Sequence, residues 1–412
     1  MLAPLKKSEL RIIAFSLFML TSGMSLIGPL MPIYITQLGN FAPRDAARWA
    51  GLIEGITFIM SAIFSPIWGM LGDRFGRKSM VLRAFFGMSI TMALLSLCQT
   101  PLQMFFVRMV HGCIAGAISA SIALVSTRVE EKEMGSTLGL LHSFILAGTV
   151  GGPFIGGLLA DAFGFQLCFF ITSAILLCCG ALIAFYIPAT QENKPKNGHH
   201  YTLSDNFRYY FGNRQLRLIS AVLLLSQMAR MGQKPIVPLF ISSLSSNLTC
   251  LPTVVGSVFG LSGLAAALSV KFWGKRADKY GFRATLLLTL SGAAFFTLGM
   301  PLSQAIWQIA LFHALAGLFN SGTTPLLQSL IALNSEKTRR GCVYGTVMIF
   351  QMLGNAAGPM LGGVVSEQFG FRLSLFLLGL LFIVGWFLVR FKMKEKESDY
   401  RVADAISESE AE

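Results

Sequence analysis

Three ionisable residues, Glu54, Arg108 and His111, lie inside long apolar stretches of the sequence. A charge among apolar residues is costly, so each needs a partner or a wet cavity. Glu54 is the one carboxylate that we place inside these stretches, about as deep in its stretch as Arg108 is in its own. We therefore predict a Glu54–Arg108 ion pair, which either responds to protons or ties two helices together. His111 lies three residues beyond Arg108, on the same helical face, and either relays a proton or forms an internal hydrogen bond.

Two further cations, Arg230 and Lys234, are spaced four residues apart in another apolar stretch. This spacing places them on one helical face, where they repel each other. With Glu54 assigned to Arg108, the pair favours an anionic ligand, with Arg230 as its fixed anchor. Lys234 is a second cation, or an amine that releases its proton in an apolar pocket. The alternative is that Lys234 extends toward the membrane surface.

A short basic turn from Gly69 to Lys78 joins two of the apolar stretches, and a similar segment from Gly274 to Arg283 joins two others. Its glycines permit close approach and a tight turn. Its aspartate can accept hydrogen bonds from a helix N-terminus and pair with a neighbouring cation. We predict a latch that closes one face of the protein in one state; the alternative is that the charges only orient the helices. The latch residues are Gly69, Asp73, Arg74, Gly76, Arg77, Lys78 and, in the second copy, Asp278.

Two other stretches carry glycines at every fourth position beside a proline. Small faces let helices pack closely, and proline bends a helix. The predicted packing and kink residues are Gly148, Gly152, Pro153, Gly156 and Gly157, with Gly358 and Pro359 in the second stretch.

The apolar composition of the chain indicates that these residues lie on membrane-spanning helices. The 412-residue chain is 54% hydrophobic and 13% charged, with a mean hydropathy of +0.63, whereas a soluble domain carries about 25% charged residues. The pattern predicts an all-α membrane protein whose twelve spans cover 12–35, 49–71, 80–98, 103–126, 137–160, 167–187, 217–241, 252–273, 284–302, 306–332, 343–366 and 372–391. No metal-ligand spacing, nucleophile–base pair or phosphate loop occurs, so we expect no enzyme, metal or cofactor.

Charge placement predicts the topology. Most of the 33 Lys and Arg residues fall at the termini or around the even-numbered loops, whereas the odd-numbered loops contain only Arg44, Arg48 and Arg372. The positive-inside rule then places both termini in the cytoplasm, as in a multi-pass protein of a bacterial inner membrane. This bias also accounts for the net charge of +13, so nucleic-acid binding is not expected.

The sequence repeats after 205 or 206 residues, which predicts two parallel six-helix halves. Pro29 and Pro32 match Pro235 and Pro238, and the two glycine-rich stretches match each other. We predict a first bundle at 1–187, a cytoplasmic linker at 188–216, a second bundle at 217–391 and a disordered tail at 392–412. The linker from Leu203 to Leu216 forms either an amphipathic helix at the inner membrane surface or a plain connection.

The chain resembles the major facilitator superfamily, in particular the twelve-span drug:proton antiporter-1 group. The basic turn resembles the family's motif A, Arg108-x2-His111-Gly112 its motif B, the Gly148–Gly157 stretch its motif C, and Gly23-x5-Pro29-Leu-Met-Pro32 its first-span motif. This resemblance implies alternating access, with the lipid bilayer, protons and a small molecule as partners, and with the protein as a monomer.

In the family, spans 1, 4, 7 and 10 line a central cavity, which implies that Arg230 and Lys234 face the substrate. Met24 and Met31 offer an adaptable wall, and Asn320, Gln351 and Asn355 offer neutral hydrogen bonds. Span 1 lacks the acidic residue of several cation exporters. We expect proton-coupled multidrug or metabolite efflux with a bias to anionic cargo. The alternatives are transport of a carboxylate-type siderophore or other anionic metabolite in either direction, and a membrane sensor that transports nothing.

Overall fold

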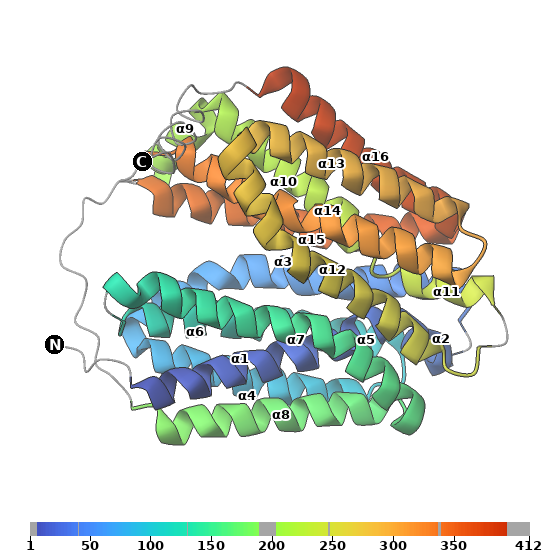
Figure 1. The fold of residues 1–412 in the computed structure, drawn as a ribbon. Helices are drawn as coiled ribbons and strands as arrows, with labels where there is room; N and C mark the ends of the chain where they lie inside the picture. Colours follow the sequence, from blue (N-terminus) through green and yellow to red (C-terminus); the bar gives the residue numbers. More distant parts are fainter. Residues whose placement is uncertain are drawn as a thin grey trace. The chain divides into compact units, whose positions relative to one another are not determined.

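The computed structural model describes residues 6–39, 41–129, 131–188, 203–245, 248–336 and 339–393, and the regular elements among them are all helical (Figure 1). The first part contains α1 (Lys7–Ile27), η1 (Gly28–Leu30), α2 (Met31–Gly39), α3 (Pro43–Phe75), α4 (Arg77–Ser96), α5 (Pro101–Ile114), α6 (Ala117–Ser126), η2 (Glu131–Glu133), α7 (Met134–Phe163) and α8 (Phe165–Tyr186). The second contains α9 (Leu203–Gly212), α10 (Arg214–Gly232), α11 (Val237–Leu244), α12 (Leu251–Tyr280), α13 (Phe282–Gly299), η3 (Met300–Leu302), α14 (Ile306–Leu333), α15 (Arg340–Phe369) and α16 (Phe371–Lys392).

The described residues group into two compact units. Unit 1 holds those up to 198 together with 245–260, and unit 2 holds those from 199 to 244 and from 261 onward. Helix α12 therefore begins in unit 1 and ends in unit 2. Helix α9 groups with unit 2, whereas the sequence-based boundaries treat it as linker; those boundaries stay a prediction.

The predicted fold class, an all-helical membrane protein, is confirmed. Within the described ranges, ten helical segments are long and apolar enough to cross a membrane. The other two expected spans, α10–α11 and α14, are also helical. Their sequences are less apolar than those of the other ten, because α10 contains three arginines and α14 contains a polar run around Asn320.

Three of the expected spans are interrupted. The first span changes to a 3-10 turn at Gly28–Leu30, and the seventh is interrupted between Gly232 and Val237. Pro29 and Pro235 lie in these two breaks, where they lack the backbone donor that a continuous helix requires. The fourth span breaks at Gly116, whose φ of 123° favours glycine.

The internal repeat extends to individual hydrogen bonds. In unit 1, Nε1 of Trp68 donates to the carbonyl of Cys113 at 2.6 Å. In unit 2, Nε1 of Trp273 donates to the carbonyl of Leu318 at 2.8 Å, 205 residues later at both ends. Equivalent helices of the two units are therefore joined by the same bond.

Both basic turns also have matching geometry. Gly76 and Gly281 adopt φ values of 87° and 86°, so each ends one helix and starts the next within a single residue. Nζ of Lys78 donates to the carbonyl of Ala184 at 2.8 Å, and Nη2 of Arg283 donates to that of Arg390 at 2.7 Å. In each unit, a cation that follows the turn binds the end of a neighbouring helix.

The two glycine-rich stretches, here called glycine stripes, lie on α7 (Gly148–Gly157) and on α15 (Gly354–Gly363), where these helices contact the backbone of a neighbouring helix. A Cβ atom added to Gly156 of α7 would lie 2.2 Å from the carbonyl oxygen of Leu26 in α1. A Cβ atom at Gly362 of α15, which lies 206 positions later, would lie 2.9 Å from the carbonyl oxygen of Gly232 in α10. Helices α7 and α15 run unbroken through Pro153 and Pro359. The stripes thus occupy equivalent backbone contacts in the two units.

Candidate functional site

Glu54 and Arg108 lie in unit 1 on α3 and α5, which pack closely together. Thr57 Oγ1 donates to the carbonyl of Arg108 at 3.4 Å, and a Cβ atom added to Gly112 would lie 2.4 Å from the Thr57 carbonyl. Arg108 is 4% exposed, and the charge of Glu54 acts on it. The Glu54–Arg108 ion pair stays a prediction, because Nε of Arg108 is buried without a hydrogen-bond partner among the described residues.

His111 connects this pair to a third helix. Its Nδ1 lies 2.6 Å from Thr91 Oγ1 of α4, and its side chain is 1% exposed. The imidazole is one helical turn from Arg108 on the same helix. His111 thus forms an internal hydrogen bond, and a part in proton relay stays a prediction.

Arg230 in unit 2 belongs to a cluster of amide side chains between α10 and α15. Its Nε donates to Oε1 of Gln227 at 3.0 Å, and its side chain is exposed. Gln227 packs against Gly354, within one turn of Gln351 and Asn355 on α15. Oε1 of Gln351, Oδ1 of Asn355 and Nε2 of Gln227 are buried without a hydrogen-bond partner among the described residues. The guanidinium of Arg230 and the Nε2 donor of Gln227 can bind an anionic group, whereas the free amide oxygens of Gln351 and Asn355 are acceptors that suit hydrogen-bond donors on a ligand.

Gln227 is the member of this cluster that sequence reasoning missed. It lies three residues before Arg230, on the same face of α10. That spacing is the one signal that could have identified it.

The other predicted binding residues are more scattered. Lys234 is half-buried in the break between α10 and α11, and Asn320 is half-buried on α14. In unit 1, Met24 is half-buried on α1, whereas Met31 is 4% exposed and packs in the interior of its unit.

The latch residues surround the turn between α3 and α4, but the side chain of Asp73 lies outside the described part of the structure. Arg74 is exposed and lies over the ring of Phe75, 5.4 Å from its centroid. Arg77 lies next to Gly72, whereas a Cβ atom at Gly69 would meet open space. In the second copy, Asp278 is exposed.

Sequence reasoning missed a buried ion pair between Glu9 and Arg128. Nη2 of Arg128 lies 3.0 Å from Oε2 of Glu9, and their side chains are 2% and 8% exposed. The two residues lie 119 positions apart at helix ends that the hydropathy pattern treats as solvent-exposed. Their pairing has no local sequence signal.

Two other polar contacts in unit 1 were also missed. The carboxylate of Asp161, at the end of α7, accepts hydrogen bonds from Thr253 Oγ1 and, at 2.8 Å, from the Thr253 backbone N–H in the first turn of α12. The guanidinium of Arg83 lies 3.6 Å from the ring centroid of Trp68. Among the described residues, no group of three or more His, Cys, Asp or Glu side chains could hold a metal ion.

Comparison with known proteins identifies the family. Residues 13–240 and 219–408 match the sequence signature of the Major Facilitator Superfamily. The chain is 29% identical to the MFS-type transporter YuxJ of Bacillus subtilis (strain 168), over 94% of this chain and 98% of that protein. It is 32% identical to the multidrug resistance protein MdtG of Proteus mirabilis (strain HI4320), over 89% of this chain and 91% of that protein. Residues 61–69 alone also suggest MdtG, and the comparison confirms that resemblance.

Solved structures support the same fold. An inward-facing, unoccupied bacterial homologue of the human lysosomal transporter Spinster has a TM-score of 0.78 at 14% identity, over 94% of this chain and 97% of that chain. The human organic anion transporter MFSD10 has a TM-score of 0.68 at 18% identity, over 92% and 98%. At these identities the likeness shows the fold alone. From the match across nearly the whole sequence, the chain belongs to the Major Facilitator Superfamily and is a multi-pass membrane transporter, not an enzyme.

Proposed function

We propose that this secondary transporter exports small organic molecules in exchange for protons, by alternating access, with a preference for anionic cargo. The observation that carries the proposal is the cluster around Arg230. Arg230 is an exposed residue, and among the described residues its guanidinium has no carboxylate partner. The neighbouring amides of Gln227, Gln351 and Asn355 have unused hydrogen-bonding atoms. An anionic group would supply acceptors for Arg230 and take up the amide donor of Gln227.

Proton coupling is assigned to Glu54 and Arg108. Protonation of Glu54 removes the charge that offsets Arg108, and loss of one partner of a buried pair costs about 3–5 kcal/mol. A change of that size is large enough to shift the populations of two conformations by more than a hundredfold. His111 is close enough to Arg108 to take part in proton movement through the same region.

The efflux direction rests on the named relatives and on the glycine stripe of α7. MdtG of Proteus mirabilis is named a multidrug resistance protein, and the stripe resembles the antiporter motif. We further propose that Asp73 acts in the predicted latch, and that the protein operates in a bacterial inner membrane with both termini in the cytoplasm. Asp73→Asn should then abolish transport while leaving insertion and thermal unfolding unchanged; full transport by this variant would rule the latch out.

The test for cargo is a ligand screen with purified protein at two pH values, across anionic, neutral and cationic solutes. Arg230→Gln should lower the affinity for anionic ligands by about tenfold or more, because charge-assisted hydrogen bonds contribute roughly 1.5–3 kcal/mol. Lys275→Gln removes an exposed cation of unit 2 at the end of α12 and serves as the matched control. If Arg230→Gln impairs only cationic ligands, the charge argument is wrong.

The test for coupling is flux in proteoliposomes with and without a pH gradient. We expect flux to fall when the gradient is collapsed, and Glu54→Gln to remove this dependence. Flux that ignores the gradient would exclude proton coupling while leaving the anion preference standing. The same assay, run with the substrate on either side, distinguishes export from uptake of an anionic metabolite such as a carboxylate-type siderophore, which the Arg230 cluster also suits.

A further inference from the structure

A small cavity lies at the end of unit 2 where α10 begins and α16 ends. Its volume is about 290 Å³, close to the lower limit of small-ligand sites, roughly 300–1,000 Å³. It is lined by Asn213, Arg214, Gln215, Phe391, Lys392 and Met393. Among the described residues, the lining thus contains two cations, two amides and no carboxylate. Arg214 and Lys392 are exposed, and neither has a carboxylate partner among the described residues.

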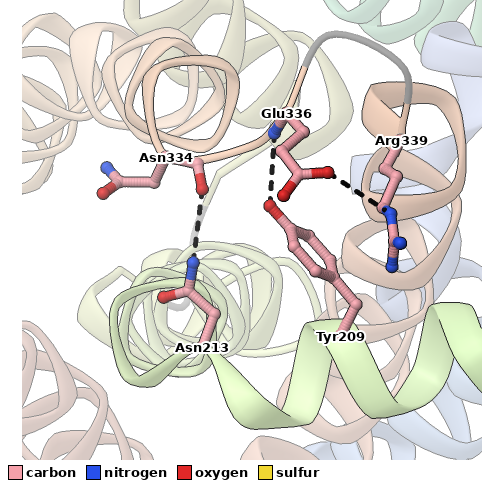
Figure 2. Close-up of polar contacts among 5 residues, drawn as sticks. All are labelled: Tyr209, Asn213, Asn334, Glu336 and Arg339. Carbon is pink, nitrogen blue, oxygen red and sulfur yellow. Dashed lines mark hydrogen bonds and ion pairs between the residues drawn. The ribbon is translucent and has the colours of Figure 1, made fainter.

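The wall formed by Asn213 is held from several sides. Its Oδ1 accepts from the backbone N–H groups of Gln215 and Leu216 at 2.9 and 3.3 Å, which caps α10. Its Nδ2 donates to the carbonyl of Asn334 at 3.3 Å (Figure 2). The N–H group of Arg214, the first residue of α10, takes no part in this cap. The corner between α9 and α10 is therefore fixed before any ligand arrives.

A second contact holds the same corner through α9. The hydroxyl of Tyr209 accepts from the backbone N–H of Glu336 at 3.2 Å, and the guanidinium of Arg339 lies 4.8 Å from the Tyr209 ring centroid. Figure 2 shows Tyr209 pointing from α9 toward Glu336 and Arg339. On the opposite wall, Met393 is 5% exposed, whereas Phe391 is 72% exposed and stacks on Phe387 at 5.8 Å. The cavity therefore has a rigid polar side and an apolar side with an exposed ring.

The internal repeat shows that the two cations are not required by the fold. The matching bonds of Lys78 to Ala184 and Arg283 to Arg390 relate α8 to α16 by 206 residues. With the same offset, Phe391 corresponds to Phe185, which is also exposed, but Lys392 corresponds to Tyr186.

The start of α10 gives the same result. Gly156 meets Leu26, and Gly362 meets Gly232, so α1 and α10 are also related by 206 residues. Arg214 then corresponds to Ser8. The aromatic ring is common to both units, whereas the cations are specific to the cavity in unit 2.

We propose that this cavity binds a phosphate group, presented either by an anionic lipid headgroup or by a soluble phosphoester. The guanidinium of Arg214 can bind two phosphate oxygens at once, and the ammonium of Lys392 adds a point charge. The amide of Gln215 and the N–H of Arg214 supply neutral donors. Basic pockets between helices on the cytoplasmic side of a membrane suit anionic headgroups. The exposed Phe391 belongs at the interface between headgroups and acyl chains.

The surrounding surface agrees with a cytoplasmic position. Arg217, Lys275 and Lys279 are exposed at the ends of helices on this side of unit 2. By the positive-inside rule, these cations place the cavity at the inner leaflet, where anionic lipids face basic residues.

The test uses the full-length protein, purified in a non-ionic detergent and titrated with phosphatidylglycerol, phosphatidylethanolamine or inorganic phosphate. Bound molecules are counted by native mass spectrometry, and the unfolding temperature is measured in parallel. A cation near an anionic headgroup contributes roughly a fivefold gain in affinity, so Arg214→Gln with Lys392→Gln should weaken phosphatidylglycerol binding about thirtyfold. Arg214→Lys with Lys392→Arg should retain most of the binding.

The matched control is Lys7→Gln with Arg11→Gln, which removes two exposed cations from the start of α1 in unit 1. This pair should bind phosphatidylglycerol as the unaltered protein does. Binding of phosphatidylglycerol that depends on Arg214 and Lys392 identifies a lipid site, and binding of inorganic phosphate with the same dependence identifies a soluble-phosphate site. The proposal is overturned if the Arg214→Gln with Lys392→Gln variant binds phosphatidylglycerol and inorganic phosphate as tightly as the Lys7→Gln with Arg11→Gln variant does, or if phosphatidylethanolamine binds as tightly as phosphatidylglycerol.

Discussion

Replacing Gly156 with alanine tests whether the glycine stripe of α7 serves close helix packing. The added Cβ atom would lie 2.2 Å from the Leu26 carbonyl oxygen and 2.8 Å from its carbon. Both are backbone atoms, so no side-chain rotation can relieve the clash, and α1 and α7 must separate. Overpacking of this kind costs about 1–3 kcal/mol.

Gly151 provides the control, because it lies in the same helix and a Cβ atom there would meet nothing within 4 Å. Both substitutions gain the same helix propensity, about 1 kcal/mol, so the difference between the two variants isolates the steric cost. At roughly 2–4 °C per kcal/mol for 150–250 residues, Gly156→Ala should unfold about 2–12 °C below Gly151→Ala.

The assay is thermal unfolding in detergent, followed by tryptophan fluorescence and by the fraction of monodisperse protein, with flux measured on the same preparations. If the two variants unfold at the same temperature, the steric explanation is wrong. If Gly156→Ala unfolds normally but transports nothing, the stripe serves the conformational cycle rather than stability.

Three other substitutions probe contacts in unit 1. Glu9→Gln should lower the free energy of unfolding by about 3 kcal/mol, because it leaves the buried guanidinium of Arg128 without its counter-charge; Glu9→Leu with Arg128→Met should recover most of this loss in thermal unfolding. Asp161→Ala should cost about 1 kcal/mol and speed hydrogen exchange in the first turn of α12, because Thr253 loses its acceptor; equal exchange in both proteins would show that the contact is dispensable. Trp68→Phe should cost about 1–3 kcal/mol in chemical unfolding, because it leaves a carbonyl without its donor, and an unchanged midpoint would contradict this.

The sequence predicted the helices and the repeat because both signals are local. Gly76 and Gly281 each lie in a short segment between two predicted spans, and both adopt the positive φ that only glycine adopts easily. The breaks at Pro29 and Pro235 were harder to predict, because proline is tolerated in the first turn of a helix as well as in a break. Whether a proline ends a helix depends on how neighbouring helices satisfy the exposed carbonyl groups, which the sequence does not record.

In the candidate site, too, residues with a local sequence signal could be predicted and residues placed by packing could not. Glu54 and Arg108 could be matched from sequence because an ionised group in an apolar stretch demands a counter-charge at the same depth. Gln227 carries no charge, so its sequence position does not indicate a partner, yet its amide is hydrogen-bonded to Arg230. Glu9 and Arg128 lie at helix ends where charges are expected, and only the packing of their helices buries them.

Lys78 and Arg283 each combine a contact in the folded protein with a predicted role in membrane insertion. During membrane insertion, lysines and arginines in cytoplasmic loops retain those loops on the inner side. In the folded protein, these two residues bind the last carbonyl groups of α8 and α16. In the predicted topology, one residue of each unit thus orients a newly made span and also anchors the neighbouring helix. A lysine and an arginine perform this pair of tasks in the two units, so exchange between these two residue types should be tolerated at either position, whereas a neutral residue would disturb biogenesis and packing together.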